Sequence, residues 1–439
     1  MTDQVTGLVC VICGTAYPAE EAGYVCPDHD NEGILDVRYD YDLVASRISK
    51  ESLRDERDTT MWRYRPLLPM APDAAVPPLT VGGTPTYDAP RLARTLGIAR
   101  VWVKDEGRQP TASLKDRASA MAIVKASEAG AEVVTTASTG NAAAALSGLS
   151  ASIGQKNVIF VPETAPQAKI AQLLAYGSTV ALVKGTYGDA FDLCMEAAAE
   201  FGWYNRNTGF NPYMTEGKKT AGLEILEQLD WNVPDAIFVS VGDGSIIGGV
   251  HKAMKDALAL GWIDHSPRIY GIQSAGSDYL VQAFESGEDV LTKAPISADT
   301  IADSISADLP RDRIKAMAAV IETDGAYLRV SDEAILAAVP TLARGSGVFA
   351  EPAGAAAYAG LVAAVDRGLI GPTDVVVVLS TGSGLKDIAS AMKAVTAAGT
   401  EPMVVEPTLE ALKKAMETNT RYQVLGTQYS VPSTPKTTN

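Results

Sequence analysis

Residues 236–249 read AIFVSVGDGSIIGG, a short apolar run that passes through a glycine-rich turn into a helix-like pattern. The β-branched and aromatic residues predict a buried strand, and four glycines within eight residues let backbone N–H groups approach an anion. The turn is not a Walker loop, because no Gly-Lys-Ser/Thr follows, and Ile247 breaks the Gly-x-Gly-x-x-Gly pattern. By itself the stretch fits a structural strand-to-helix turn as well as a phosphate site.

Other short runs rich in β-branched residues surround this one, at residues 100–106, 131–138, 157–162, 179–185, 268–274 and 375–384. Alanine-rich stretches with helical apolar spacing separate them, such as SAMAIVKASEAGA and AFDLCMEAAAEFG. Strands that alternate with helices predict an α/β protein with parallel sheets covered on both faces. In such sheets ligands gather beyond the carboxyl ends of the strands.

The composition is that of a large globular protein. With 439 residues, of which 46% are hydrophobic and 21% charged, the chain can bury a large core and divide into two lobes. The N-terminus lacks a basic start followed by an apolar run, and no stretch is apolar for long enough to span a bilayer, so we expect a cytoplasmic protein with no membrane partner. The net charge of -16 argues against a nucleic-acid partner and still allows one local anion pocket.

Lys115 lies in PTASLKDRAS, residues 110–119, between a small-residue turn and the expected first turn of a helix. The helix dipole disfavours a cation there, so we expect the amine to shift toward its neutral, nucleophilic form. A neutral lysine can form a Schiff base with a carbonyl compound, most commonly pyridoxal phosphate. The alternative is an exposed lysine that pairs with Asp116 or Asp105.

Two further loops leave predicted strands in the same way. In TASTGNAAAA, Ser138 or Thr139 is a candidate helix cap whose neighbouring donors could bind a carboxylate, and Asn141 could face a ring substituent. In VLSTGSGLKD, the hydroxyls of Ser380, Thr381 and Ser383 follow the most hydrophobic strand. Helix capping alone would also explain either loop.

Five motifs in this order, EGRQPTASLKDR, TASTGNAAAA, VSVGDGSIIGG, FAEPAGAAAYAGL and LSTGSGLKD, resemble the fold type II pyridoxal phosphate enzymes, and within that group the threonine synthase family. The resemblance covers residues 80–415. It implies a two-lobed fold of the tryptophan synthase β type, with parallel sheets flanked by helices, and pyridoxal 5'-phosphate as the cofactor. By analogy alone it also implies a homodimer.

The resemblance implies a role for each candidate site residue. Lys115 would carry the cofactor as a Schiff base and afterwards move protons at the substrate. Asn141 would lie beside the ring hydroxyl and Thr381 would meet the pyridine nitrogen, while Ser138 and Thr139 would bind the substrate carboxylate. The cofactor phosphate would be held by the glycine-rich turn, at Gly242, Asp243, Gly244, Ser245 and Ile246.

The reaction that the resemblance implies is that of a carbon–oxygen lyase on a small amino-acid substrate. A threonine synthase converts O-phospho-L-homoserine and water into L-threonine and phosphate. The alternatives are replacement or elimination at Cβ of phosphoserine, serine or threonine, as in cysteate synthase or a dehydratase. An alternative of another class is a non-catalytic amino-acid sensor.

The chain departs from the threonine synthase pattern at two positions. Met214 stands in NPYMTEGKKT where that family tends to have arginine, and Asp192 stands where an arginine helps to bind the substrate phosphate. An anion beside a phosphorylated substrate would be unfavourable. Compensating cations could come from basic residues nearby, namely Lys184, Arg206, Lys218 or Lys219. The segment TIADSISADLPRDRIKAM resembles the family only loosely, and we expect it to line the substrate side.

Three of the four cysteines crowd into residues 10–26 and need a separate explanation. Cys10 and Cys13 form one pair of ligands at two-residue spacing, and Cys26 and His29 form a second, which together suit a tetrahedral structural Zn²⁺. The alternative is a degraded ribbon that folds without metal.

These patterns predict five parts of the chain. They are a zinc-ribbon-like segment at 1–35, a helical and extended region of the large lobe at 36–95, the large cofactor-binding lobe at 96–130 and 220–415, the small lobe at 131–219, and a C-terminal tail at 416–439.

Overall fold

Two parallel sheets contain all the strands that the sequence predicts. The structure, a computed structural model, describes residues 3–21, 23–165 and 167–418. The larger sheet has the order β12-β11-β10-β13-β5-β4, with β4 (Thr86–Asp88), β5 (Arg100–Asp105), β10 (Ala236–Ser240), β11 (Arg268–Ser274), β12 (Tyr327–Val330) and β13 (Val375–Ser380). The smaller has the order β8-β7-β6-β9, with β6 (Val133–Ala137), β7 (Lys156–Pro162), β8 (Thr179–Val183) and β9 (Tyr204–Asn205).

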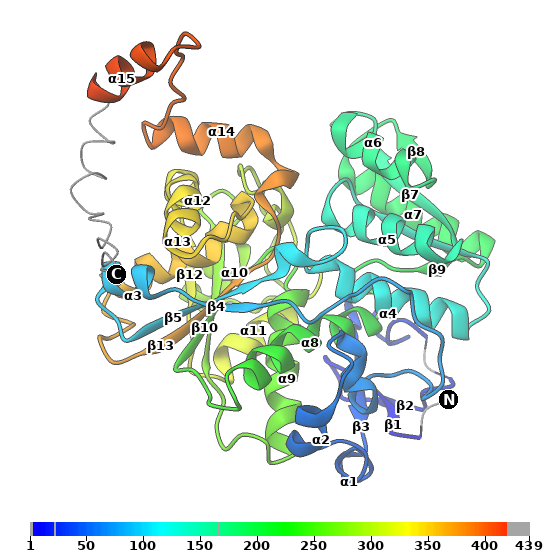
Figure 1. Cartoon of the computed structure of the whole chain (residues 1–439). Helices are drawn as coiled ribbons and strands as arrows, with labels where there is room; N and C mark the ends of the chain where they lie inside the picture. Colours follow the sequence, from blue (N-terminus) through cyan, green and yellow to red (C-terminus); the bar gives the residue numbers. More distant parts are fainter. Residues whose placement is uncertain (1–2, 22, 166, 419–439) are drawn as a thin grey trace, which may run out of the picture. The chain divides into compact units, whose positions relative to one another are not determined.

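The larger sheet is parallel except for its edge strand β4 and is covered on both faces (Figure 1). Its central strand β13 is fully buried from Val376 to Leu379, which explains the uninterrupted valine run. One face packs against α13 (Pro352–Asp366), and the other against α9 (Ser245–Ala259) and α11 (Arg313–Ile321). Outside these lie α3 (Pro90–Leu96), α8 (Tyr213–Gln228), α10 (Tyr279–Ser286), α12 (Asp332–Ser346) and the first part of α14 (Ile388–Ala397).

The smaller sheet is sandwiched by helices that follow its own strands. In Figure 1 it lies with α5 (Asn141–Ile153), α6 (Gln167–Ala175) and α7 (Tyr187–Phe201). Its strands lie within the predicted small lobe, although the lobe boundaries themselves stay a prediction. The helix α4 (Lys115–Glu128) packs against both α5 and α8 and so connects the two sheets.

Close packing of α4 against α8 buries an ionic cluster. A Cβ on Gly217 would lie 2.3 Å from the Arg117 carbonyl oxygen, so only glycine permits this approach. Arg117 is fully buried and forms ion pairs with Glu106 and Glu224 at 2.8 and 2.6 Å, and Lys104 pairs with Glu224 at 2.7 Å. These charges are all balanced inside the protein.

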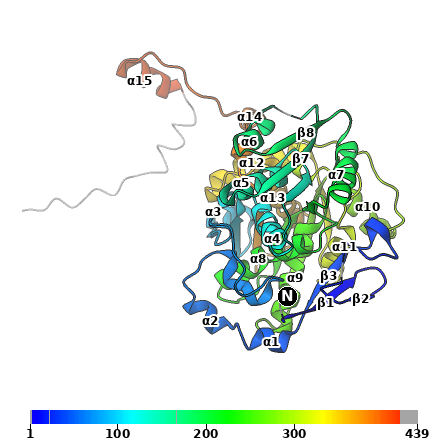
Figure 2. The same cartoon turned by 90° about the vertical axis from the view of Figure 1, so that its right-hand side faces the viewer.

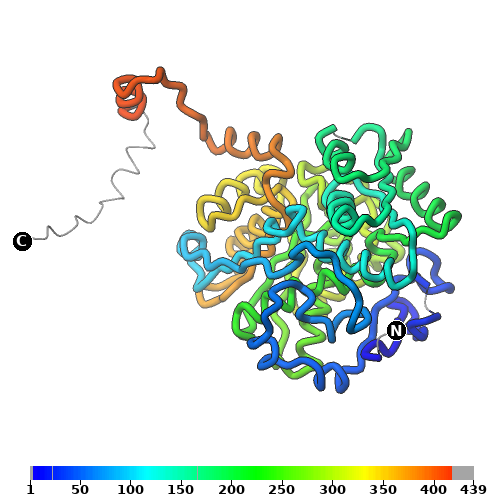
Figure 3. The backbone as a smooth tube through the Cα atoms, turned by 45° about the vertical axis from the view of Figure 1, so that its right-hand side comes forward, coloured from blue at the N-terminus to red at the C-terminus, as the bar shows by residue number. Residues whose placement is uncertain are grey.

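The N-terminal segment forms a third, antiparallel sheet in the order β2-β1-β3, with β1 (Val5–Cys10), β2 (Ala16–Tyr17) and β3 (Leu35–Tyr39). It is anchored to the large sheet's helices (Figures 2 and 3). Lys252 of α9 pairs with Asp36 at 2.9 Å, Arg313 of α11 pairs with Glu32, and the Tyr39 hydroxyl donates to Glu216 at 2.5 Å. The short helices α1 (Tyr41–Ala45) and α2 (Lys50–Asp55) follow.

The chain separates into a unit of residues Met1–Ala394 and a unit of Val395–Asn439. The described part of the second contains the end of α14 and α15 (Leu409–Thr418). The predicted tail at 416–439 falls outside the described residues except for 416–418. Within the described chain, the helices are too short or too polar to cross a membrane.

Candidate functional site

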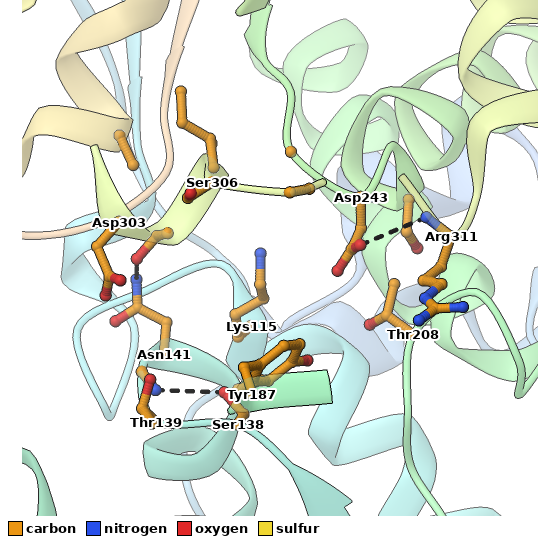
Figure 4. A pocket seen from close by; sticks show the side chains of 18 of the residues that line it. Lys115, Ser138, Thr139, Asn141, Tyr187, Thr208, Asp243, Asp303, Ser306 and Arg311 are labelled. Atoms are coloured by element: carbon orange, nitrogen blue, oxygen red, sulfur yellow. Dashed lines mark hydrogen bonds between the residues drawn. The ribbon is translucent and has the colours of Figure 1, made fainter. Parts of the chain in front are cut away.

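A cavity of about 730 Å³ lies beyond the carboxyl ends of strands from both parallel sheets. The end of β10 leads into the glycine-rich turn, and β13 ends beside Thr381. The smaller sheet contributes the segments that follow β6, β8 and β9, which include Ser138, Tyr187 at the start of α7, and Arg206. Figure 4 shows side chains from these loops around one space. The position is the one that strand polarity predicts for a ligand site in an α/β fold.

Lys115 is the first residue of α4, and its amine faces the cavity (Figure 4). The turn before it is held in place by a hydrogen bond from Leu114 N to Thr381 O of 2.9 Å. Burial lowers the pKa of Lys115, and the positive charge of Arg206 lowers it further. The predicted direction of the shift is confirmed, with burial and a neighbouring cation as its causes, and the contribution of the helix dipole stays a prediction.

The two carboxylates proposed as partners of an exposed Lys115 are engaged elsewhere. Asp116 accepts hydrogen bonds from the backbone N–H and hydroxyl of Thr111, and burial raises its pKa to about 6. Asp105 pairs with Arg108 at 3.1 Å. The alternative of an exposed, ion-paired lysine is therefore wrong.

The glycine-rich turn ends at Gly244, which is the N-cap of α9 and has a φ of 93°. No side chain caps this helix, so its first N–H groups are free to meet an anion. Ser245 lies at its first position and accepts a hydrogen bond of 2.7 Å from Lys218. Asp243 accepts from the backbone N–H of Arg311 at 3.4 Å and leaves the N-terminus of α9 uncovered.

The loop after β6 presents a second uncapped helix. The N-cap of α5 is Gly140, and neither Ser138 nor Thr139 caps it, so the prediction of a side-chain cap was wrong. Ser138 Oγ instead accepts from Gly140 N at 3.2 Å. Asn141 donates from Nδ2 to Glu351 at 2.6 Å and to Ser304 at 3.3 Å. Burial raises the pKa of Glu351 to about 7.

The structure thus brings all the predicted cofactor and substrate residues into the wall of one cavity. These residues are Lys115, Ser138, Thr139, Asn141, Gly242, Asp243, Gly244, Ser245, Ile246 and Thr381. The other two hydroxyls of the last loop lie outside this wall. Ser380 is buried without a hydrogen-bond partner among the described residues, and Ser383 accepts from Leu385 N at 3.3 Å.

The two departures from the family pattern do not line the cavity. Asp192 lies on the exposed side of α7, whereas Phe191 faces inward, and Met214 is fully buried in an apolar core. Asp192 therefore does not place a negative charge in the cavity wall, where it would repel a phosphorylated substrate.

Two of the four candidate compensating cations, Arg206 and Lys218, do line the cavity. The other two do not, because Lys184 is exposed and Lys219 pairs with Glu216 and Asp256 at 2.6 and 2.7 Å. Burial lowers the pKa of Lys218 well below its ordinary value, and Lys115 and Arg206 lower it further.

Polar wall residues that sequence reasoning missed include Tyr187, Thr208 and Glu351. Glu351 belongs to the motif FAEPAGAAAYAGL, and an acidic residue directly before a helix could have been recognised there as a candidate site residue. Arg311 belongs to the segment 300–317, which we expected to line the substrate side. Residues 303–309 and Arg311 do lie in the cavity wall, and their place on the substrate side stays a prediction. Tyr187 and Thr208 carried no signal in the sequence.

Away from this cavity, the four predicted metal ligands meet at the end of the N-terminal sheet. The ligand atoms of Cys10, Cys13, Cys26 and His29 all lie within 4.8 Å of one another. The Cys13–Cys26 sulfur distance is 4.0 Å, and His29 Nδ1 lies 3.4 Å from Cys26 Sγ. Bond lengths of about 2.3 Å to sulfur and 2.0–2.1 Å to nitrogen give a tetrahedron with edges of this size, so the set fits Zn²⁺.

Comparisons with known proteins agree with this geometry. Residues 78–382 match the family described as pyridoxal-phosphate dependent enzyme. The chain is 37% identical over 411 residues to the threonine synthase of Methanocaldococcus jannaschii, which covers 93% of this chain and 98% of that protein. It is 38% identical over 412 residues to the threonine synthase of Methanosarcina acetivorans, with the same coverage of 93% and 98%.

Solved structures show the same architecture. The processed form of threonine deaminase isoform 2 from Solanum lycopersicum superposes with a TM-score of 0.62 at 25% identity, covering 72% of this chain and 83% of that one. Diaminopropionate ammonia lyase from Escherichia coli superposes with a TM-score of 0.61 at 18% identity, covering 72% and 88%, and shows the fold alone.

Proposed function

Because the chain belongs to the pyridoxal-phosphate dependent enzyme family, we propose that it is a threonine synthase, which converts O-phospho-L-homoserine and water into L-threonine and phosphate. Family membership makes it a pyridoxal phosphate enzyme of the lyase type, with the fold type II architecture that the sequence predicted. The observation that carries the proposed reaction is the cavity itself. It contains a lysine with a lowered pKa, two uncapped helix N-termini and cations beyond those one phosphate requires.

The residues present fit pyridoxal phosphate. In our proposal the N-terminus of α9, with Gly242, Asp243, Gly244, Ser245 and Ile246, holds the cofactor phosphate, and Lys218 adds a hydrogen-bond donor beside Ser245. A Cβ on Gly244 would lie 2.7 Å from Ala316 Cβ and 2.9 Å from the Asp312 carbonyl oxygen, so the turn could not be built with a larger residue. Asn141 would lie beside the ring hydroxyl and Thr381 at the ring nitrogen.

Lys115, Ser138 and Thr139 would act on the substrate. The free N–H groups at the start of α5, together with the Ser138 and Thr139 hydroxyls, would orient the substrate carboxylate. Bound pyridoxal phosphate supplies the electron sink that makes protons at Cα and Cβ removable and lets phosphate leave from Cγ. The Lys115 amine would move the proton at Cα, because a lowered pKa leaves a larger neutral fraction at neutral pH.

One substrate panel tests the proposal against its alternatives. Purified protein loaded with pyridoxal phosphate would be given O-phosphohomoserine, phosphoserine, serine and threonine, with phosphate, ammonia, keto acid and threonine measured. Release of phosphate with threonine formation from O-phosphohomoserine alone is the expected result. Keto acid from serine or threonine, or replacement on phosphoserine, would establish one of the other reactions. Absence of any turnover would favour the sensor.

We also propose that Cys10, Cys13, Cys26 and His29 hold a structural Zn²⁺. Its support is the compact set of three sulfurs and one imidazole nitrogen, a combination common in structural zinc sites. The cluster belongs to the N-terminal sheet and has no proposed part in the reaction.

A further inference from the structure

Arg206 is a fully buried arginine that forms no ion pair with any carboxylate of the described residues, the nearest acidic influences being the more distant Asp116 and Asp243. It directly follows β9, and its backbone N–H extends the sheet by donating to Thr135 O at 2.9 Å. Its guanidinium donates to Ser119 Oγ at 3.1 Å and to Thr208 Oγ1 at 3.3 Å. Nη2 is buried without a hydrogen-bond partner among the described residues. One terminal nitrogen of a residue that lines the cavity is therefore without a hydrogen-bond partner.

The contrast with Arg117 shows how unusual this is. Arg117 is equally buried and is neutralised by Glu106 and Glu224, whereas no carboxylate of the described chain forms an ion pair with Arg206. The pKa of Arg206 is lowered to about 10, and the cause is burial. A buried cation without a counter-ion is costly, and such charges persist in proteins where a ligand supplies the opposite charge.

A second cation stands on the same side of the cavity. The Arg311 guanidinium lies 4.8 Å above the ring of Phe191, and Figure 4 shows it next to Thr208. The backbone of the loop after β9 packs on it closely, since a Cβ on Gly209 would lie 2.3 Å from Arg311 Cβ. Thr208 thus lies beside both arginines. We call Arg206, Thr208 and Arg311 the distal cation site.

Lys218 belongs to the neighbouring anion site. Its Nζ is bonded to Ser245, the first residue of α9, at 2.7 Å, and to Thr208 at 3.2 Å. The cavity therefore offers one uncapped helix N-terminus with its own lysine and, adjacent to it, two arginines. One phosphate group bound at the α9 N-terminus would pair with that helix start and Lys218, and would leave the two arginines without an anion.

We propose that the distal cation site binds the phosphate of a phosphorylated amino-acid substrate and sets the selectivity for phosphorylated over unphosphorylated substrates. This rests on the proposed function. In this chain the task would fall to the loop after β9 and to the segment before α11, because position 192 of α7 carries an acid that faces solvent. Arginine suits the role, since its fork of N–H donors matches phosphate oxygens.

The test uses the enzyme loaded with pyridoxal phosphate and, as probe, an amino acid that carries a non-hydrolysable phosphonate at its end. Binding is followed by the change in visible absorbance of the cofactor, with homoserine as the unphosphorylated comparison. Arg206→Gln and Arg311→Gln should each weaken phosphonate binding by about 10- to 100-fold, as expected for a lost charge-assisted contact, and change homoserine binding by less than about threefold. Arg206→Lys should recover part of the loss.

Two control variants sharpen the result. Lys184→Gln removes an exposed cation outside the cavity and should leave both affinities unchanged. Asp192→Arg should bring no gain for the phosphonate, because this side chain points to solvent. A clear gain from Asp192→Arg would overturn the proposal, as it would place the phosphate at α7.

Other outcomes would overturn it as well. Equal losses for the phosphonate and for homoserine would make the arginines general structural residues. A loss of affinity for pyridoxal phosphate in Arg206→Gln, with unchanged discrimination, would assign Arg206 to the cofactor. The half-buried Arg311 gives an independent variant if Arg206→Gln folds poorly.

The two proposals can fail separately. Arginine-dependent phosphonate binding without threonine formation from O-phosphohomoserine would overturn only the proposed reaction. Threonine formation with normal discrimination in both arginine variants would overturn only the distal cation site.

Discussion

The chemistry proposed for Lys115 depends on the groups that surround its amine. Burial and the charge of Arg206 both lower its pKa, and the carboxylates of Asp116 and Asp105 are bonded to other groups. Asp116 and Asp105 are thus not available to hold the amine as an ammonium ion, and the more distant Asp243 and Glu351 offset the lowering only in part.

Lys115→Ala should abolish turnover while the protein stays folded. The variant removes the amine that would bind the cofactor and move the Cα proton, so we expect a loss of at least about 10²- to 10⁴-fold. The measurement is phosphate release together with the absorbance of lysine-bound cofactor, and circular dichroism reports folding. Lys184→Ala is the control, and residual activity near the parent level in Lys115→Ala would contradict the assignment.

Glu351 should make the free energy of unfolding fall with increasing pH. Burial raises the pKa of Glu351 from 4.5 to about 7, so the folded protein holds this proton more tightly than the unfolded chain. The contribution is complete below pH 4.5 and is lost as the pH rises toward 7. Over that window it amounts to about 3 kcal/mol.

The check is urea unfolding of cofactor-free protein at pH 5 and pH 8. Glu351→Gln should reduce the difference between the two pH values by a few kcal/mol, while Glu200→Gln, on the exposed side of α7, should leave it unchanged. An identical pH dependence in Glu351→Gln and the parent would refute the prediction.

At the scale of elements, the starts of two helices matter most. Both α5 and α9 begin at a glycine N-cap without a side-chain cap, directly after a parallel strand. A cap would stabilise either helix by about 1 kcal/mol, so its absence leaves N–H donors unused unless a ligand arrives. In our proposal, both of these uncapped helix starts bind an anion.

Gly244→Ala should damage cofactor binding more than stability alone explains. Its left-handed φ of 93° and the contact of a new Cβ with Ala316 would force the turn to open. Gly261, at the other end of α9, has a φ of 65° and open space around a Cβ, so Gly261→Ala should cost about 1 kcal/mol of stability and keep the cofactor affinity. The affinity of each variant for pyridoxal phosphate is measured by titration. Equal affinities of Gly244→Ala and Gly261→Ala would contradict the prediction.

The sequence predicted the buried strands well and the contacts of single side chains poorly. Runs such as VVVVLS are apolar without alternation because both faces of β13 are covered, and that pattern is visible in the letters. The cap expected at Ser138 or Thr139 was wrong because residue type favours a cap but cannot show that the hydroxyl turns to another N–H. The place of Asp192 was misjudged because one residue along a helix rotates a side chain from the cavity to solvent.

At the scale of the whole molecule, the cavity exists only where the two parallel sheets bring their carboxyl ends together. Neither Arg206 nor Thr208 carries a recognisable motif, and both reach the cavity because β9 pairs with β6. Such positions follow from the tertiary fold, so Thr208 was not predicted, and Arg206 was named only as one of four basic residues that could compensate for Asp192. The motif-bearing loops could be predicted because each combines a strand end with a helix start.

Removal of metal should loosen the N-terminal sheet. Three sulfurs and one imidazole would hold about one Zn²⁺ per chain, so a strong chelator or Cys26→Ser should remove the metal and lower the melting temperature. Metal analysis and calorimetry give the two readouts. Cys194→Ser is the matched control, because this buried cysteine lies on α7 outside the cluster and should leave the zinc content unchanged. Zinc retained by Cys26→Ser would exclude this site.

The position of β13 has a consequence for the order in which the protein can be made. Residues 375–380 insert between β10 and β5, and Thr381 O accepts the hydrogen bond that fixes the turn before Lys115. During synthesis, β5 and β10 leave the ribosome long before the strand that must separate them. More than half of the chain is therefore synthesised between Lys115 and Thr381. A nascent protein interrupted before residue 381 would contain Lys115 but would lack the hydrogen bond that fixes the turn before it.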